Sequence, residues 1–186
     1  TLDDATTELY SAFFVEEEGT LSSFRGLHEV IGTKGLFSSL YADRGSHYWY
    51  TEEAGGKVDK TRLTQVHRAL QQLGVTLIPA YSPEARGRSE RAFRTLQDRL
   101  PKELALAGIT EMAAANRYLT EQFLPHYNER FMVRATETGT AFIPAATPQL
   151  TGLDLVNQAL LGFLQSRRRE RVATLDMDAT LVESHK

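Results

Sequence analysis

The chain has 186 residues, of which 41% are hydrophobic and 24% are charged, and it contains no cysteine. This composition is typical of a globular protein that is long enough to bury a core, and it excludes a disulfide framework and a thiolate metal site. The net charge of −3 argues against a protein whose whole surface is covered by nucleic acid.

Two further features of the composition bear on location and partners. No apolar run approaches the length of a membrane span, and the acidic first residues do not fit a signal peptide, so we expect a cytoplasmic protein with no membrane partner. The charge is unevenly distributed, because residues 1–20 hold six acids and no Lys or Arg, whereas residues 82–102 hold six basic and three acidic residues. A nucleic-acid contact surface is therefore expected near residues 82–102.

The first third of the chain predicts a hairpin, a helix and a strand. Residues 1–7 predict a strand that ends in a turn, with Asp3 and Asp4 as turn formers, and residues 8–15 predict the returning strand. Apolar residues at helical spacing predict a helix over 21–34, with Thr20 as its N-cap.

An acidic residue follows the next predicted strand, residues 36–42. Asp43 comes directly after this strand and before a glycine turn, which places it at a carboxyl edge, where open α/β sheets hold their chemistry. The aromatic segment 45–50 either packs beneath this loop or flanks a ligand.

A second acid lies among arginines after a further helix and strand, predicted at residues 62–73 and 75–79. Pro83 and Gly87 predict a turn, and the helix that follows carries Glu90 in its second turn. A carboxylate with several arginines around it suits a site that holds a divalent cation beside phosphates.

The segments Tyr41–Ser46 and Tyr81–Arg91 together resemble the second and third acidic motifs of the retroviral-integrase-type catalytic core, which many insertion-sequence transposases share. The resemblance covers roughly residues 1–142. It implies an α/β, RNase H-like fold, a mixed sheet flanked by helices, with the amino-terminal strand missing and a helix-and-strand tail at the carboxyl end.

The resemblance also implies a chemistry, DNA strand cleavage and transfer by a polynucleotidyl transferase. Asp43 and Glu90 would bind Mg²⁺ (or Mn²⁺), and the DNA would be transposon ends and target. His47, in the aromatic segment 45–50, is a candidate for contact with a scissile phosphate. A homo-oligomer is a further expectation. The arginines expected to contact DNA are Arg44, Arg86, Arg88, Arg91 and Arg94.

In that family the first catalytic Asp lies on a strand upstream of Thr1, so we expect this chain alone to be inactive. Asp3 and Asp4 fit the turn after the second strand and are expected to cap it rather than bind metal. The alternative functions are a non-catalytic DNA-binding protein and an inert relic.

The remaining residues predict helices over 101–132, a linker over 143–150 and a tail over 151–186. The tail predicts a helix over 153–165, a basic run over 167–171 and, within 172–182, a strand that delivers Asp176 or Asp178 to a site. This tail resembles the start of a second, different transposase family, which would make Asp178 a metal ligand. It also resembles the first motif of haloacid-dehalogenase-type phosphatases, in which Asp176 would be the nucleophile. We favour the transposase interpretation, because the helix, the basic run and the strand resemble that family together.

Overall fold

The computed structural model describes the chain except for residues 54–55, 82, 147–149, 154–173, 177–178 and 183–186. Its main sheet has four strands in the order β1-β8-β3-β6. These strands are β1 (Leu2–Asp3), β8 (Ala179–Val182), β3 (Ser39–Ala42) and β6 (Thr76–Pro79). The sheet is mixed, since β3 runs parallel to β6 and antiparallel to β8, while β8 runs parallel to β1.

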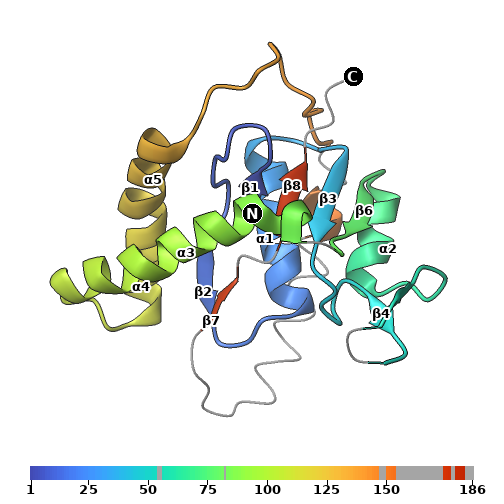
Figure 1. Ribbon diagram of the computed structural model, residues 1–186, viewed down its shortest axis with the longest axis horizontal. Coiled ribbons are helices and arrows are strands. Elements are labelled where there is room, and N and C mark those ends of the chain that lie inside the picture. The colour runs from blue at the N-terminus through green and yellow to red at the C-terminus, as the bar shows by residue number, and fades with distance from the viewer. Residues whose placement is uncertain (54–55, 82, 147–149, 154–173, 177–178, 183–186) are drawn as a thin grey trace.

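Two smaller ladders flank this sheet. Antiparallel pairing joins β2 (Phe13–Val15) to β7 (Thr174–Asp176), and β4 (Tyr50–Thr51) to β5 (Val58–Asp59). The strands of the tail therefore pair with strands from the first third of the chain, as Figure 1 shows for β7 and β8.

One hydrophobic core lies between the sheet and the helices α1 (Thr20–Thr33) and α2 (Gln65–Gln72). Phe24 and Ile31 of α1 and Leu70 of α2 are almost fully buried there, because apolar residues recur at helical spacing along both helices. Leu40 of β3 and the loop residue Trp49 pack into the same core.

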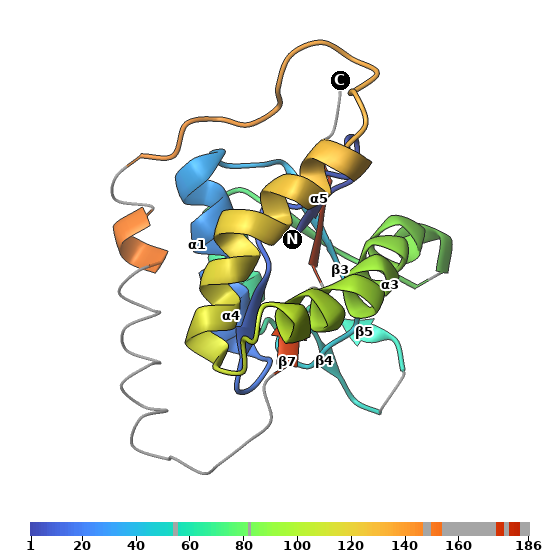
Figure 2. The same cartoon turned by 90° about the vertical axis from the view of Figure 1, so that its left-hand side faces the viewer.

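A second core joins β1 to the later helices, which Figure 2 shows from the side. The long helix α3 (Pro83–Leu106) contributes Leu96 and Leu100. A continuous helical segment follows, made of α4 (Met112–Tyr118), the π-helical turn η1 (Leu119–Phe123) and α5 (Leu124–Phe131). None of the helices within the described ranges is both long and apolar enough to cross a membrane.

The first two predicted elements are present with small changes. The hairpin is closed by an antiparallel bridge between Leu2 and Leu9, and the Asp3 carboxylate accepts a hydrogen bond from the backbone N–H of Thr6 at 2.9 Å. Asp3 thus caps the turn, as predicted. The helix α1 begins one residue earlier than expected, with Gly19 rather than Thr20 at the N-cap, because the Ser22 hydroxyl accepts a hydrogen bond from the Gly19 N–H at 2.9 Å.

The third helix differs more from the prediction. We expected Pro83 and Gly87 to form a turn, but both lie inside α3. Proline is tolerated at the first position of a helix, where its missing N–H would have no partner. Glu90 does lie in the second turn of this helix, as predicted. The predicted helix over 153–165 lies almost entirely outside the described residues.

The mixed α/β architecture with flanking helices agrees with the expected fold class, and the RNase H-like assignment stays a prediction. The division of the chain into residues 1–142, 143–150 and 151–186 also stays a prediction. Within the last part, β7 and β8 are shared with the sheets formed by the first part.

Candidate functional site

The carboxyl ends of β3 and β6 meet at one edge of the sheet. The two strands are parallel and in register from Ser39 opposite Thr76 to Ala42 opposite Pro79. Ala80 continues the pairing, since its N–H donates to the carbonyl of Ala42 at 2.9 Å. Asp43 therefore leaves the sheet at this edge, as the sequence predicted.

The Asp43 loop, residues 43–49, is fixed by its own backbone. The Oδ1 atom of Asp43 accepts a hydrogen bond from the Gly45 N–H at 2.8 Å, and the Gly45 carbonyl accepts from the N–H groups of Tyr48 and Trp49 at 3.0 and 2.9 Å. A Cβ atom on Gly45 would lie only 3.0 Å from Asp43 Oδ1 and 2.9 Å from Cε1 of His47. Only glycine fits this turn without moving its neighbours.

Aromatic side chains anchor the far end of the Asp43 loop. Tyr48 and Trp49 are 2% and 1% exposed, so the interpretation of segment 45–50 as core packing is confirmed for these two residues. The Trp49 ring meets the edge of His67 with the centroids 5.0 Å apart. His47 is half-buried, with its Nε2 3.7 Å from a carboxylate oxygen of Glu18.

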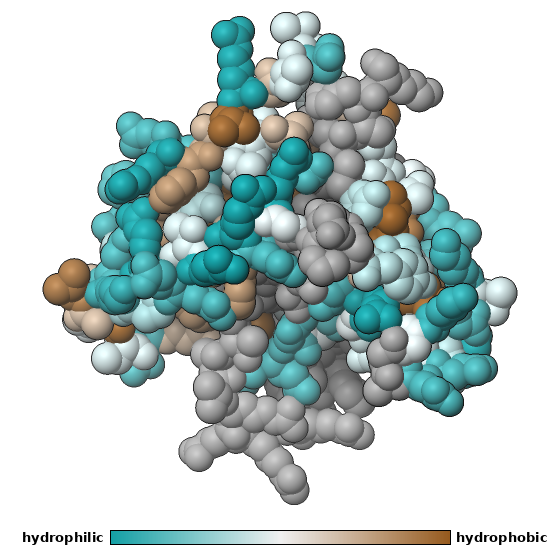
Figure 3. Space-filling view, viewed as in Figure 1, coloured by the Kyte–Doolittle hydropathy of each residue, from teal (hydrophilic) through white to brown (hydrophobic). Residues whose placement is uncertain are grey.

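Glu90 lies on the exposed surface of α3, to one side of the face that enters the second core. That face is formed by Ser89, Ala92 and Leu96, all buried. At 3.6 residues per turn, Glu90 and Arg94 share one flank of the helix, and Arg88 lies on the opposite flank. Hydrophilic side chains gather over α3 in Figure 3.

The predicted DNA-contacting arginines have different surroundings. Arg88 pairs with the Asp4 carboxylate at 2.9 Å, which ties α3 to the turn after β1. Arg91 donates from Nε to the Gly87 carbonyl at 3.0 Å and is exposed, as is Arg94. Arg86 lies on α3, but its side chain is outside the described part of the chain.

Arg44 lies in an open hollow beside Asp43. Its guanidinium donates to the Gly56 carbonyl at 3.1 Å and lies 5.6 Å from the centre of the Tyr81 ring. Tyr81 is 54% exposed, and its hydroxyl accepts from the Val58 N–H at 3.3 Å. Exposed Lys57 also lines the hollow.

The sequence reasoning did not identify Lys57 or Tyr81 as site residues. Lys57 precedes β5 and Tyr81 follows β6. The two residues meet because β5, β6 and the Asp43 loop converge. For Tyr81 the sequence offered one signal of a site, an aromatic residue that closely follows a strand ending at a sheet edge.

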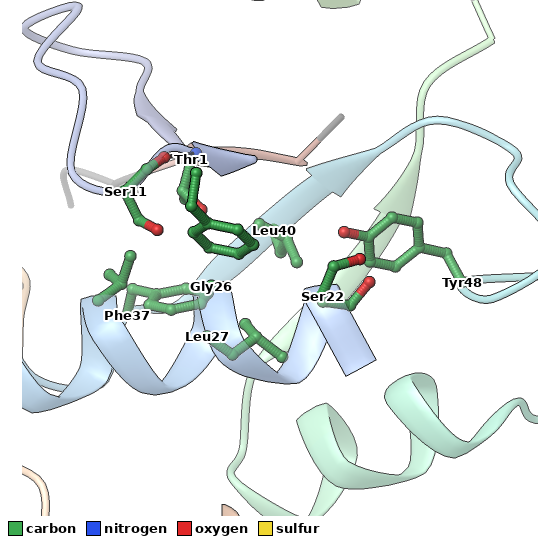
Figure 4. Close-up of a pocket in the computed structure, with 11 residues that line it drawn as sticks. Thr1, Ser11, Ser22, Gly26, Leu27, Phe37, Leu40 and Tyr48 are labelled. Carbon is green, nitrogen blue, oxygen red and sulfur yellow. Dashed lines mark hydrogen bonds between the residues drawn. The ribbon is translucent and has the colours of Figure 1, made fainter. Parts of the chain in front are cut away.

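A small pocket elsewhere does not belong to this edge. Figure 4 shows it between α1 and the strand that carries Leu40, with Ser11 and Gly26 also in its lining. Its volume of about 20 Å³ leaves room for a single water. It is a packing void rather than a substrate site.

The metal assignment rests on donor chemistry. Asp43 and Glu90 offer carboxylate oxygens, which are the ligands that Mg²⁺ and Mn²⁺ prefer. Within the described residues, no group of three or more His, Asp or Glu side chains is arranged to hold an ion. Asp178, the third predicted ligand, lies outside the described residues, and Asp176 lies in β7.

Two bacterial proteins are similar to this chain. The chain is 36% identical over 134 residues to y4bF of Sinorhizobium fredii (strain NBRC 101917 / NGR234), which is named as a transposase. It is 30% identical over 130 residues to the transposase for insertion sequence IS1202 of Streptococcus pneumoniae. These matches cover 71% and 70% of this chain but 28% of each relative.

The chain thus spans little more than a quarter of the length of the curated relatives it matches. No family model and no solved structure matches it. The similarity supports a relation to transposases.

Proposed function

We propose that this chain is a DNA-binding part of a transposase, and that the edge formed by Asp43, Arg44 and α3 is its nucleic-acid and metal site. The observation that carries the proposal is the position of a half-buried carboxylate beside an exposed hollow with two cations and an aromatic ring. The similarity to two transposases supports the same assignment.

The cations in this proposal have a positioning role. Arg44 and Lys57 at the hollow and Arg91 and Arg94 on α3 would contact phosphates, which fix the register of DNA without reading its sequence. Arg88 has a second role, because its ion pair with Asp4 holds the first turns of α3 against β1.

Asp43 and Glu90 would hold Mg²⁺ or Mn²⁺. A bound divalent cation activates a water or hydroxyl nucleophile and stabilises the leaving oxygen in phosphoryl transfer. In this chain, the Gly45 N–H fixes one oxygen of Asp43, so the carboxylate keeps its orientation before any ligand arrives.

DNA binding is the first test. We expect a fluorescently labelled duplex to bind the chain with an affinity that falls as salt rises, because counterions leave the DNA on binding. Arg44→Ala should weaken binding about tenfold and lower the salt slope by about one, the value for one lost phosphate contact. Arg68→Ala is the matched control, because Arg68 is an exposed arginine on α2.

Metal binding is the second test, with Mn²⁺ followed by electron paramagnetic resonance. Asp43→Asn and Glu90→Gln should each reduce Mn²⁺ binding at least tenfold, while Glu129→Gln, an exposed glutamate on α5, should not. Equal binding by all four proteins would reject the metal site. Salt-dependent DNA binding without Mn²⁺ binding would favour the non-catalytic alternative, and loss of both would favour an inert relic.

We expect Mg²⁺-dependent nicking at background level and negligible strand transfer from this chain alone. A nicking activity abolished by Glu90→Gln would contradict the first expectation and would show that this chain is sufficient for strand cleavage.

A further inference from the structure

Two asparagine side chains bond to the backbone of residues 9–14, the segment that leads into β2. The Asn128 side chain accepts from the N–H of Leu9 at 2.8 Å and donates to its carbonyl at 2.9 Å. The Asn116 side chain pairs with Phe14 in the same way, at 2.7 and 3.0 Å. Each side-chain amide makes the two hydrogen bonds that a residue of a neighbouring strand would make. We call these two pairs the edge clamps.

Both edge clamps come from one continuous helical segment. Asn116 lies in α4 and Asn128 lies in α5, and Figure 2 shows these two helices in line, in front of the blue N-terminal strands. In a regular α-helix, side chains that are twelve positions apart, as these two are, point in directions about 120° apart. A regular helix would therefore not present both asparagines to one strand.

The π-helical turn between the two asparagines removes this mismatch. In η1 the N–H of Leu124 donates to the carbonyl of Leu119, five positions back instead of four, so the turn holds one extra residue. The asparagines are then related as residues eleven positions apart in a regular helix, about 20° from a common direction. Pro125 accounts for the place of the turn, because its ring would clash with the carbonyl four positions before it.

The strand contains a matching irregularity. The N–H groups of Tyr10 and Ser11 both donate to the carbonyl of Thr1, at 3.0 and 3.4 Å. Two residues opposite one form a β-bulge, which inserts one residue into a strand. Consecutive residues of a strand turn their N–H and C=O groups to alternate edges. Leu9 and Phe14 are five positions apart, so without the bulge they would face opposite edges.

We propose that the segment α4–η1–α5 takes the place of a neighbouring strand along residues 9–14, and that η1 sets its register. The lengths agree, since five residues of strand extend at most about 17 Å and eleven residues of helix rise about 16 Å. The end of α5 bonds to the preceding turn as well. The Val133 N–H donates to the Thr6 carbonyl at 2.8 Å, and the Thr7 hydroxyl donates to the Phe131 carbonyl at 2.9 Å. The helix thus covers an edge that would otherwise be open to another strand.

The register of η1 also bears on the candidate site. Leu119 and Phe123 of η1 lie in the second core together with Leu96 and Leu100 of α3, the helix that carries Glu90. A change of register at η1 would therefore reach α3 through this core.

Hydrogen exchange followed by nuclear magnetic resonance tests the edge clamps in the full chain. Asn116→Ala should accelerate exchange of the Phe14 N–H about tenfold, because this donor loses its partner. Asn128→Ala should do the same for the Leu9 N–H. Rates are taken relative to the Val30 N–H of α1, in the first core, so that changes in global unfolding cancel.

Gln122→Ala is the matched control, because Gln122 is an exposed side-chain amide in η1. It should change neither rate. An unchanged Phe14 N–H in Asn116→Ala, or an unchanged Leu9 N–H in Asn128→Ala, would overturn the edge clamps.

Changing the length of η1 tests the register. Both variants are made in the Pro125→Ala chain, so that proline does not decide the form of the turn. Deletion of exposed Thr120 places the asparagines eleven positions apart, which a regular α-helix brings within about 20° of a common direction. Insertion of one alanine after Thr120 leaves them about 120–140° out of phase, with or without a π-turn.

We expect the deletion to keep the exchange rates of the Leu9 and Phe14 N–H groups within about threefold of the parent rates, and the insertion to accelerate one of them about tenfold. A tenfold acceleration in the deletion variant, or failure of that variant to fold, would overturn the role of η1. Protection of both groups in the insertion variant would overturn it as well. Neither experiment uses DNA or metal, so failure here is distinct from failure of the proposed function.

Discussion

The two predicted acids are held in opposite ways. Asp43 lies in a loop whose backbone hydrogen bonds fix the carboxylate and whose far end is anchored by buried Trp49. Glu90 lies on the exposed surface of a helix, and no side chain within the described part of the chain bonds to its carboxylate. One acid is thus preorganised by its loop, whereas the position of the other follows from the packing of α3 alone.

Removal of the Trp49 side chain, which anchors the Asp43 loop, should have the largest effect on the unfolding free energy. Trp49→Ala removes a side chain that is 1% exposed from the first core, and large-to-small changes of aromatic residues cost about 3–5 kcal/mol of unfolding free energy. Urea denaturation followed by circular dichroism measures the loss. Leu106→Ala on α3 is the control, since Leu106 is 89% exposed and the change should stay within about 0.5 kcal/mol.

Replacing glycine by alanine should change the unfolding free energy in opposite directions in the two regions. Gly45→Ala places a Cβ within 3.0 Å of Asp43 and His47, and such overpacking costs about 1–3 kcal/mol. Gly87→Ala on α3 meets no atom within 4 Å and should stabilise the helix by about 0.5–1 kcal/mol. Stabilisation by both changes would show that the Asp43 loop is not closely packed.

The ion pair between α3 and the turn after β1 should contribute less to the unfolding free energy. Arg88→Gln breaks the ion pair with Asp4, which is partly exposed, and such pairs contribute at most about 1 kcal/mol. The double variant with Asp4→Asn should cost no more than either single change, and the coupling should shrink in high salt. A coupling unaffected by salt would contradict an ionic origin.

The smallest expected effect is a pH dependence of the unfolding free energy that arises at His67, which packs against Trp49. Burial and, to a lesser degree, nearby Lys60 lower the pKa of His67 below its usual 6.5. The unfolded chain then binds a proton more readily than the folded chain, so stability is full above pH 6.5 and falls as pH drops below it. His67→Gln should flatten this decline, measured by urea denaturation with Trp49 fluorescence at several pH values. An unchanged pH profile would assign the decline to other groups.

The elements that could be predicted from the sequence are those marked by a local residue pattern. Asp43 was placed correctly because a strand with apolar and aromatic residues followed by a glycine turn is a local pattern, and the turn role of Asp3 was predicted for the same reason. The start of α3 was wrong, because Pro83 and Gly87 are typical of turns, whereas both lie inside the helix. Proline fits there because the first position of a helix needs no N–H donor.

The long-range contacts had no local signal. The pairing of Arg88 with Asp4 joins residues far apart in the sequence, as does the meeting of Arg44 with Tyr81. The alternating residues of the tail predicted a strand, and β7 and β8 confirm one, but a strand pattern does not reveal its neighbours in the sheet. Those neighbours are set by which backbone edges are left open elsewhere in the chain.

The order of the strands in the main sheet has a consequence for biosynthesis. A ribosome makes β1, β3 and β6 long before β8, which belongs between the first two. The edges of β1 and β3 that pair with β8 are therefore made before their partner, and unpaired strand edges are sites for chaperones or for aggregation. Because the pairing of Leu2 with Thr180 joins residues that are far apart in the sequence, we expect this part of the sheet to form slowly.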